Sequence, residues 1–335
     1  MSPARARLTL LALLGCLLSC LATPVPPYVR GSTGEAGDVA MYKAQLSRLR
    51  ADEPYYRAIG DEMRLRGYAT RSVFDWRTPL LFSTLARVPE GAGRAALVAL
   101  GVLLLSATIA TTARQSPWVA CGTGIVQAGA AAMVMVPTAA VVAECWAGVL
   151  IGLSVCLFGL KRPKWAVPTG LLALFVRELA APYCVICTAV AVMNRRWREV
   201  AAWLAGAGVY AAYYGWHLVQ VRAHQLPTDL AHPSSWLTFG GLASVLGNTR
   251  WQAWLLLSPD LATRIALTAV LAGVIANEAQ VHVRVASLAF VGFFLVAGQE
   301  FDGYWGLVAW PTWALACGYG FHLTLLAARA AVRSS

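Results

Sequence analysis

Long apolar runs separated by short basic or polar stretches make up most of this chain. A helix that spans a bilayer needs about 20 apolar residues, and runs near that length occur at 8–22, 93–113, 118–136, 142–160, 200–220, 261–276, 285–299 and 304–327. The run at 165–193 is interrupted by Arg177, Glu178 and Pro182, and a basic cluster flanks each end. We therefore predict a hairpin of two short helices there, with Arg177 and Glu178 at its outer tip.

Basic residues at the ends of these runs predict the orientation, because Lys and Arg are enriched in cytoplasmic loops. Clusters of them lie before the first run and after three later ones: Arg5 and Arg7; Lys161, Arg162 and Lys164; Arg195, Arg196 and Arg198; Arg329 and Arg333. Both termini are accordingly expected in the cytoplasm. The first run is also compatible with a signal peptide, and Leu-Leu-Ser before Cys20 is similar to a lipoprotein cleavage pattern. Because the rest of the chain is polytopic, we favour an uncleaved anchor.

Residues 23–92 form the one long polar stretch, with ten Lys/Arg and eight Asp/Glu. The orientation of the anchor places this stretch outside the cytoplasm. Tyr42, Leu46 and Leu49 recur at helical spacing after Asp38, which predicts helices within this loop. A second external loop over about 221–260 contains a Gly-rich apolar segment, Trp236 to Leu246, expected to form a helix in the interface plane.

The expected fold is therefore all-α: a polytopic membrane helical bundle of about ten helical segments with a helical first extracytoplasmic loop. The whole chain, 1–335, is expected to be a single membrane domain. Its parts are an anchor helix at 1–22, the extracytoplasmic loop at 23–92 and the transmembrane helix bundle at 93–335.

Composition narrows the class of protein. The 335 residues are 58% hydrophobic and only 13% charged, with a mean hydropathy of +0.59, which is too apolar for a water-soluble or disordered chain. The net charge of +11 resides in short clusters beside apolar runs, so we expect no nucleic-acid partner. All eight cysteines fall within apolar runs. They are expected to be small buried hydrophobes, and the Cys184/Cys187 pair is not expected to be a redox or metal site.

Ionisable residues near the membrane mark the candidate site, because burying a charge in a bilayer is costly unless it faces a cavity or a partner. Asp38 lies at a predicted helix start, where a carboxylate either caps the backbone amides or serves as a general base above the bilayer. In the segment 68–79, the Trp76 indole could stack on a sugar or headgroup and the Arg77 guanidinium could bind an anion. Both residues also fit as ordinary anchors at the membrane interface.

Two further groups lie at the predicted outer face. Arg177 and Glu178 either neutralise one another between helices, or Arg177 grips a phosphate bidentately while Glu178 fixes its guanidinium. The turn at 300–306 presents Asp302, as a ligand-binding group or a helix cap, and Tyr304, as an interface residue.

Taken together, these features resemble bacterial integral-membrane glycosyltransferases of the GT-C type. The residues that carry the resemblance are Asp38 and Tyr42, the pair Tyr55 and Tyr56, the segment Trp76-Arg77-Thr78-Pro79, Arg177-Glu178 with Pro182, and Asp302-Gly303-Tyr304-Trp305-Gly306. The resemblance implies that Asp38 is the catalytic base and that Arg177 binds the phosphate of the lipid carrier. The predicted substrate-binding residues are Tyr42, Tyr56, Trp76, Arg77, Arg177, Glu178, Asp302 and Tyr304. No cofactor is certain. Dependence on a divalent metal is left undecided. Such enzymes often have an adjacent acidic pair directly after the first span, and this chain lacks that pair.

The function implied is transfer of a sugar from a polyprenyl-phosphate donor to an acceptor at the outer face of the bacterial inner membrane. The expected partners are the polyprenyl-phosphate sugar and membrane lipid. A single base without a second carboxylate nucleophile predicts inversion at the anomeric carbon. Two alternatives stay open: a transporter or flippase with Arg177, Glu178 and Glu144 along its path, and a non-catalytic protein of envelope biogenesis.

Overall fold

The computed structural model describes residues 1–26, 37–89, 91–231 and 235–332, apart from the side chain of Glu300. Residues 27–36 of the predicted first loop, and Arg333 of the last basic cluster, lie outside these ranges. The described residues are folded almost entirely into helices, and they contain no strand beyond one isolated bridge between Leu237 and Ala297. The prediction of an all-α fold is confirmed. The long helices are α1 (Pro3–Ala22), α5 (Ala92–Ala113), α6 (Pro117–Met135), α7 (Ala143–Gly159), α8 (Pro163–Val176), α9 (Ala181–Met193), α10 (Trp197–His224), α13 (Asp260–Ile275), α14 (Val281–Val296) and α15 (Gly306–Val332).

The shorter helices belong to the polar stretches. The first polar loop forms α2 (Asp38–Arg50), α3 (Tyr55–Leu65), the 3₁₀ turn η1 (Val73–Asp75) and α4 (Pro79–Arg87), so its predicted helical character is confirmed. The other short elements are η2 (Ala139–Val141), η3 (Glu178–Ala180), α11 (Gly241–Thr249), α12 (Ala253–Leu256) and η4 (Glu300–Trp305).

Four helical segments are long and apolar enough to cross a membrane: Pro3–Ala22, Ala92–Ala113, Pro117–Met135 and Phe301–Val332. Four shorter apolar segments accompany them, at Ala143–Gly159, Pro163–Val176, Glu178–Met193 and Val281–Val296. This composition indicates a membrane protein.

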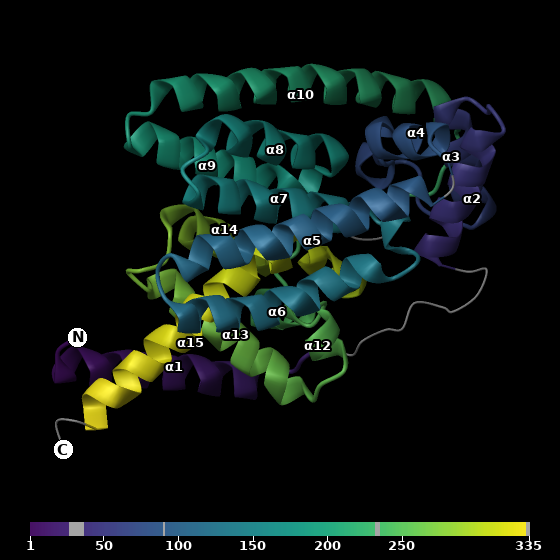
Figure 1. Ribbon diagram of the computed structural model, residues 1–335. Coiled ribbons are helices and arrows are strands. Elements are labelled where there is room, and N and C mark those ends of the chain that lie inside the picture. The colour runs from purple at the N-terminus through teal and green to yellow at the C-terminus, as the bar shows by residue number, and fades with distance from the viewer. Residues whose placement is uncertain (27–36, 90, 232–234, 333–335) are drawn as a thin grey trace.

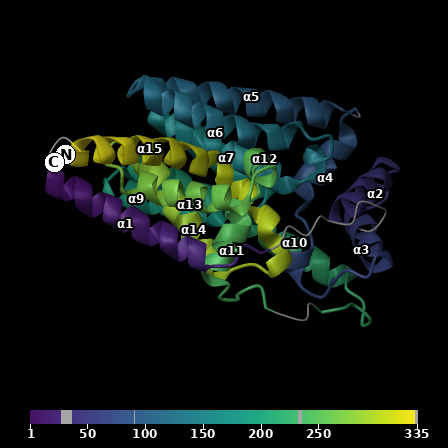
Figure 2. The same cartoon turned by 90° about the horizontal axis from the view of Figure 1, so that it is seen from below.

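The long helices lie side by side along one common direction (Figure 1). Helices α2, α3 and α4 gather at one end of this bundle, and the two chain ends lie close together at the other (Figures 1 and 2). The turns between α7 and α8 and between α9 and α10, which carry the basic clusters, lie at the end away from α2 and α3 (Figure 1). The bundle therefore has two chemically different ends.

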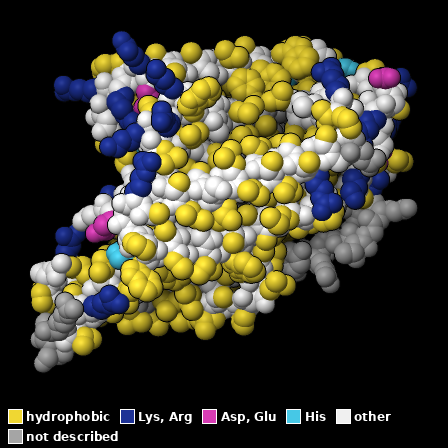
Figure 3. Space-filling model, in the orientation of Figure 1, with side chains coloured by type: hydrophobic (Ala, Val, Ile, Leu, Met, Phe, Trp, Pro, Cys, Tyr) yellow, Lys and Arg dark blue, Asp and Glu magenta, His cyan; other side chains and the backbone are white. Residues whose placement is uncertain are grey.

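The surface has the character of a membrane protein. In the space-filling view, hydrophobic side chains cover the middle of the visible face, and Lys and Arg gather toward its two ends (Figure 3). Helix α1 exposes Leu8, Leu11, Leu14 and Leu18 along one stripe and buries only three residues. Such exposed apolar surface is stable in lipid, whereas in water it would promote aggregation.

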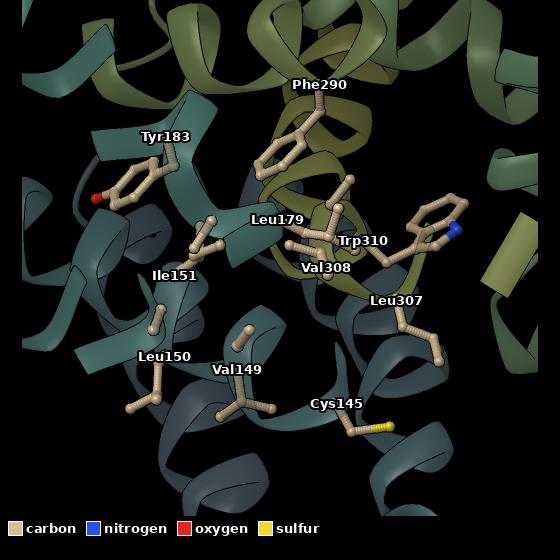
Figure 4. Close-up of a cluster of buried hydrophobic side chains, with 14 of the residues drawn as sticks. Cys145, Val149, Leu150, Ile151, Leu179, Tyr183, Phe290, Leu307, Val308 and Trp310 are labelled. Atoms are coloured by element: carbon tan, nitrogen blue, oxygen red, sulfur yellow. The ribbon is translucent and has the colours of Figure 1, made fainter. Parts of the chain in front are cut away.

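The centre of the bundle is α7, which is buried on nearly all sides by α5, α8 and α15. Val149, Leu150 and Ile151 of α7 cluster with side chains from α9, α14 and α15, including Tyr183 and Phe290 (Figure 4). Helices α13 and α15 approach so closely that a Cβ at Gly320 would collide with the backbone of α13. Small residues at a helix interface permit such backbone contact.

The predicted hairpin is confirmed as a pair of short helices, with α8 ending at Val176 and α9 beginning at Ala181. The start predicted for the helix at 236–246 is wrong. Helix α11 begins at Gly241, because Gly241 adopts a φ of 57° and the described residues directly before it are not helical. The burial expected for the cysteines holds for six of the eight; Cys16 is half-buried and Cys121 is exposed on α6.

Candidate functional site

Three charged side chains meet between the polar first loop and the bundle. Glu144 lies in the first turn of α7, and its Oε1 accepts a hydrogen bond from Nε of Arg177 at 2.7 Å. Nη2 of Arg77 lies 3.5 Å from the same oxygen. The exposed fractions of the side chains are 0% for Glu144, 3% for Arg177 and 11% for Arg77. Glu144 thus joins two arginines that are a hundred residues apart in the chain.

Arg177 owes its position to the end of α8. The backbone leaves the helix at this residue with a φ of −152°, and the 3₁₀ turn η3 begins at the next. Arg177 therefore turns toward Glu144, while its Nη1 donates to the carboxylate of Glu178. The predicted pairing of Arg177 with Glu178 is present, and Glu144 adds a second carboxylate to the same guanidinium. A buried guanidinium needs such partners, because removing an unpaired ion from water costs several kcal/mol.

Arg77 is held by the segment that follows η1. Its carbonyl accepts a hydrogen bond from the hydroxyl of Tyr55 at 2.8 Å, and Leu80 donates its amide to the hydroxyl of Tyr213 on α10 at 3.0 Å. The guanidinium donates to the hydroxyl of Tyr42 at 2.8 Å and lies over the Tyr42 ring. Burial raises the pKa of Tyr42 to about 12, against the opposing effect of Arg77. The phenol accordingly remains protonated at neutral pH.

Asp38 occupies the first position of α2, one helical turn before Tyr42 on the same face. Its carboxylate accepts a hydrogen bond from the hydroxyl of Tyr68 at 2.7 Å, and the N-cap position of α2 belongs to Gly37. Burial, and then this hydrogen bond, raise the pKa of Tyr68. The phenol of Tyr68 thus stays a donor that orients the Asp38 carboxylate.

Asp302 and Tyr304 lie in η4, directly before α15, and near the same charges. Asp302 is buried and its Oδ2 accepts a hydrogen bond from the amide of Gln299 at 2.8 Å, so it caps η4. It also lies within electrostatic range of Arg177 and Arg77. Tyr304 is within similar range of Tyr42, Glu144 and Arg77. Both residues therefore border the charged cluster.

Tyr56 and Trp76 belong to a neighbouring, separate group. The Tyr56 hydroxyl lies 2.9 Å from Nδ1 of His217 on α10, and both side chains are buried. Trp76 is 3% exposed, donates to the carbonyl of Thr70 at 2.8 Å and has the Arg64 guanidinium 5.8 Å from its ring centroid. With its ring enclosed in this way, Trp76 can stack on a ligand only if these neighbours move.

An aromatic face of α10 lies beside Glu178. Tyr210 and Tyr214 are half-buried and interact electrostatically with the Glu178 carboxylate. Phe175 of α8 packs edge-on against Tyr210, with ring centroids 5.3 Å apart. The Glu178 side chain, 23% exposed, is the most accessible member of the charged group.

For the glycosyltransferase hypothesis, sequence reasoning missed Glu144 as a site residue, along with Tyr68 and His217. The signal for Glu144 was present, because it is the one acidic residue within the apolar run at 142–160. Its bridging role depends on the packing of α7 against the end of α8, which no local pattern specifies. Within the described ranges, no group of three or more His, Cys, Asp or Glu side chains could hold a metal ion.

Comparison with protein-family models, with curated proteins and with solved structures finds no match to this chain. The site must therefore be interpreted from its own geometry.

Proposed function

We propose that this protein is a membrane glycosyltransferase of the GT-C type, which transfers a sugar from a polyprenyl phosphate to an acceptor. The observation that carries the proposal is the pair of arginines, Arg77 and Arg177, joined through Glu144 at the end of an apolar helix bundle. The first-loop helix α2 carries Asp38 one turn before Tyr42, whose hydroxyl accepts a hydrogen bond from Arg77.

The chemistry of such a donor matches this arrangement. A polyprenyl phosphate has an apolar chain and an anionic head, so its site needs lipid-facing surface beside a cation. Lipid-facing surface is present on the bundle, where α5 exposes Val102 and Leu103 and α10 exposes Val209 and Val219. Arg177 and Arg77 are the cations, and a guanidinium binds phosphate oxygens through two parallel hydrogen bonds.

Asp38 is the proposed general base. In the transfer step its carboxylate accepts the proton of the acceptor hydroxyl while the acceptor oxygen bonds to the anomeric carbon. The bond from that carbon to the phosphate oxygen breaks, and the lipid phosphate leaves with the electron pair. With a single base in this position, the step inverts the anomeric configuration.

The proposed location is the bacterial inner membrane, with about ten crossings, both termini in the cytoplasm and α2 to α4 outside. The shared position of the two chain ends supports this topology, as do the basic turns between α7 and α8 and between α9 and α10 (Figure 1). Reporter fusions within α2 and in the turn at 160–162 test it. An alkaline phosphatase fusion should be active at α2 and inactive at the turn, and the reverse result contradicts the topology.

The activity is tested with membranes that contain the protein and with radiolabelled polyprenyl-phosphate sugars. We expect Asp38→Asn to reduce transfer by about a hundredfold or more, the usual effect of losing a general base. Asp260→Asn is the matched control, because Asp260 also opens a helix and is partly exposed. Unchanged transfer in Asp38→Asn removes Asp38 from the site, and absence of transfer from every donor contradicts the proposed function.

A further inference from the structure

Glu178 is the most accessible member of a charged group that is otherwise largely buried. Its side chain is 23% exposed, against 3% for Arg177 and 0% for Glu144, and it accepts a hydrogen bond from Nη1 of Arg177. Arg77 is 11% exposed, so Glu178 is the more exposed of the two group members that reach the surface. Its carboxylate holds Nη1 of Arg177, so a ligand anion that binds this nitrogen must take the place of that carboxylate.

The charges of the group balance only while Glu178 is in place. Arg77 and Arg177 carry two positive charges, and Glu144 and Glu178 carry two negative ones. If Glu178 turns away, the remaining three side chains have a net charge of +1. A phosphodiester carries one negative charge and a phosphomonoester nearly two at neutral pH, so either can neutralise this site. The oxygens of both match the guanidinium fork as a carboxylate does.

We propose that the Glu178 carboxylate occupies the phosphate position of this site in the unliganded protein, and that the phosphate group of the ligand displaces it from Arg177. The inference rests on the proposed function for the source of the phosphate, a lipid carrier. It adds that an internal anion competes with that phosphate. Glu144 keeps both arginines in place throughout, because it is fully buried and contacts each of them.

Helix α10 offers a hydrogen-bond donor to the displaced carboxylate. Tyr210 and Tyr214 are close enough to Glu178 for electrostatic interaction. The Tyr210 hydroxyl is buried, and among the described residues it has no hydrogen-bond partner. It is therefore available as a donor to Glu178 once Arg177 is taken by the ligand.

The test is a binding titration of the full-length protein in lipid nanodiscs with radiolabelled farnesyl phosphate. Removing the competing charge in Glu178→Gln should tighten binding about tenfold, because a charge-assisted contact no longer has to be broken. Glu53→Gln is the matched control: the Glu53 side chain is also 23% exposed and also pairs with an arginine, Arg48, but on the outer loop. Its affinity should equal that of the wild type.

Equal or weaker binding in Glu178→Gln overturns the inference, as does undiminished binding in a folded Arg177→Gln variant. Competition by inorganic phosphate and by farnesol identifies the source of the anion. If farnesol fails to compete and inorganic phosphate competes as well as farnesyl phosphate, the site exists but serves free phosphate.

The transfer assay separates this inference from the proposed function. Sugar transfer by the wild type combined with unchanged affinity in Glu178→Gln removes the displacement and leaves the glycosyltransferase standing. Tighter phosphate binding in Glu178→Gln without transfer from any donor supports the displacement and contradicts the enzymatic proposal.

Discussion

Nε of Arg177 donates a hydrogen bond to Oε1 of Glu144 across 2.7 Å, in a position where neither side chain is more than 3% exposed. Two charges buried in this way are tolerated because each satisfies the other, whereas one of them alone faces the full desolvation penalty. The pair therefore fixes the end of α8 against the first turn of α7, and with it the position of the candidate site.

This pairing predicts strong coupling between the two residues. Glu144→Leu should lower the free energy of unfolding by about 3–5 kcal/mol, because it leaves Arg177 buried with one partner fewer. The double variant Glu144→Leu/Arg177→Leu should cost less than the sum of the single variants by about 1 kcal/mol or more. Unfolding of the purified protein in mixed micelles measures all three. Additive losses in the double variant would show that the two side chains do not depend on one another.

A second ion pair predicts a response to acid at the end of the bundle that carries α2 to α4. Asp229 accepts hydrogen bonds from Nε of Arg64 at 2.7 Å and from the amide of Leu226 at 3.0 Å. Burial acts to raise the pKa of Asp229, but these hydrogen bonds outweigh it and hold the pKa below the ordinary value of 3.8. A carboxylate with a lowered pKa in the folded state stabilises the fold above pH 3.8, and this contribution is lost as the pH falls through the lower, folded-state value.

The consequence is measurable at two neighbouring amides. Thr70 and Arg71 donate their amides to the carbonyl of Leu230, which follows Asp229. We expect their protection against hydrogen exchange to be high at neutral pH and to fall below about pH 4. Asp229→Asn should show the low protection at every pH, while Asp260→Asn should behave as the wild type. Protection that is independent of pH in the wild type would contradict this role of Asp229.

The sequence predicted helices well where the pattern is local. The apolar runs predicted at 93–113, 118–136 and 142–160 coincide closely with α5, α6 and α7, because a long uninterrupted apolar run identifies a buried or membrane-spanning helix from the local pattern alone. Arg177 and Glu178 were expected between two helices because charge and Pro182 interrupt an apolar run, and the structure has them there. Such features need no knowledge of the rest of the chain.

The contacts within the site could not be predicted in the same way. The junction of Arg77 with Glu144 joins positions 67 residues apart, and it depends on how the first loop docks on α7. The enclosure of Trp76 depends on Gly60, whose missing side chain leaves room for the indole. Both relationships arise from packing between elements, and the pattern along either element alone does not contain them.

Close packing between α13 and α15 gives a third prediction. A Cβ at Gly320 would collide with the carbonyl of Ala269, a backbone group that cannot rotate away. Gly320→Ala should therefore lower the free energy of unfolding by about 1–3 kcal/mol, as expected for overpacking. Gly292→Ala on α14 is the matched control, since nothing lies within 4 Å of the place that its added methyl group would take, and alanine favours a helix. Equal stability of the two variants in an unfolding titration would contradict the close approach of these helices.

The attachment of α1 gives the last prediction. Helix α1 buries only three residues, and its last turn leaves backbone carbonyls without partners in the helix. Arg264 of α13 donates to the carbonyl of Cys20 at 2.9 Å, which also accepts the amide of Thr23 at 3.3 Å, and to the carbonyl of the C-cap residue Thr23 at 3.0 Å. Since hydrogen bonds from a charged donor are worth about 1.5–3 kcal/mol, Arg264→Ala should let the end of α1 separate more often from the bundle.

Thiol labelling detects that separation. Cys20 is 1% exposed, whereas Cys121 on α6 is exposed and serves as an internal reference in the same molecule. We expect maleimide to label Cys20 about tenfold faster in Arg264→Ala, with the rate at Cys121 unchanged. Arg284→Ala is the control, because Arg284 also donates to a backbone carbonyl, that of Val274 on α13, and not to a residue of α1. If Cys20 remains protected in Arg264→Ala, the apolar contacts of α1 with α13 and α15 suffice to hold it, and the arginine is not its main attachment.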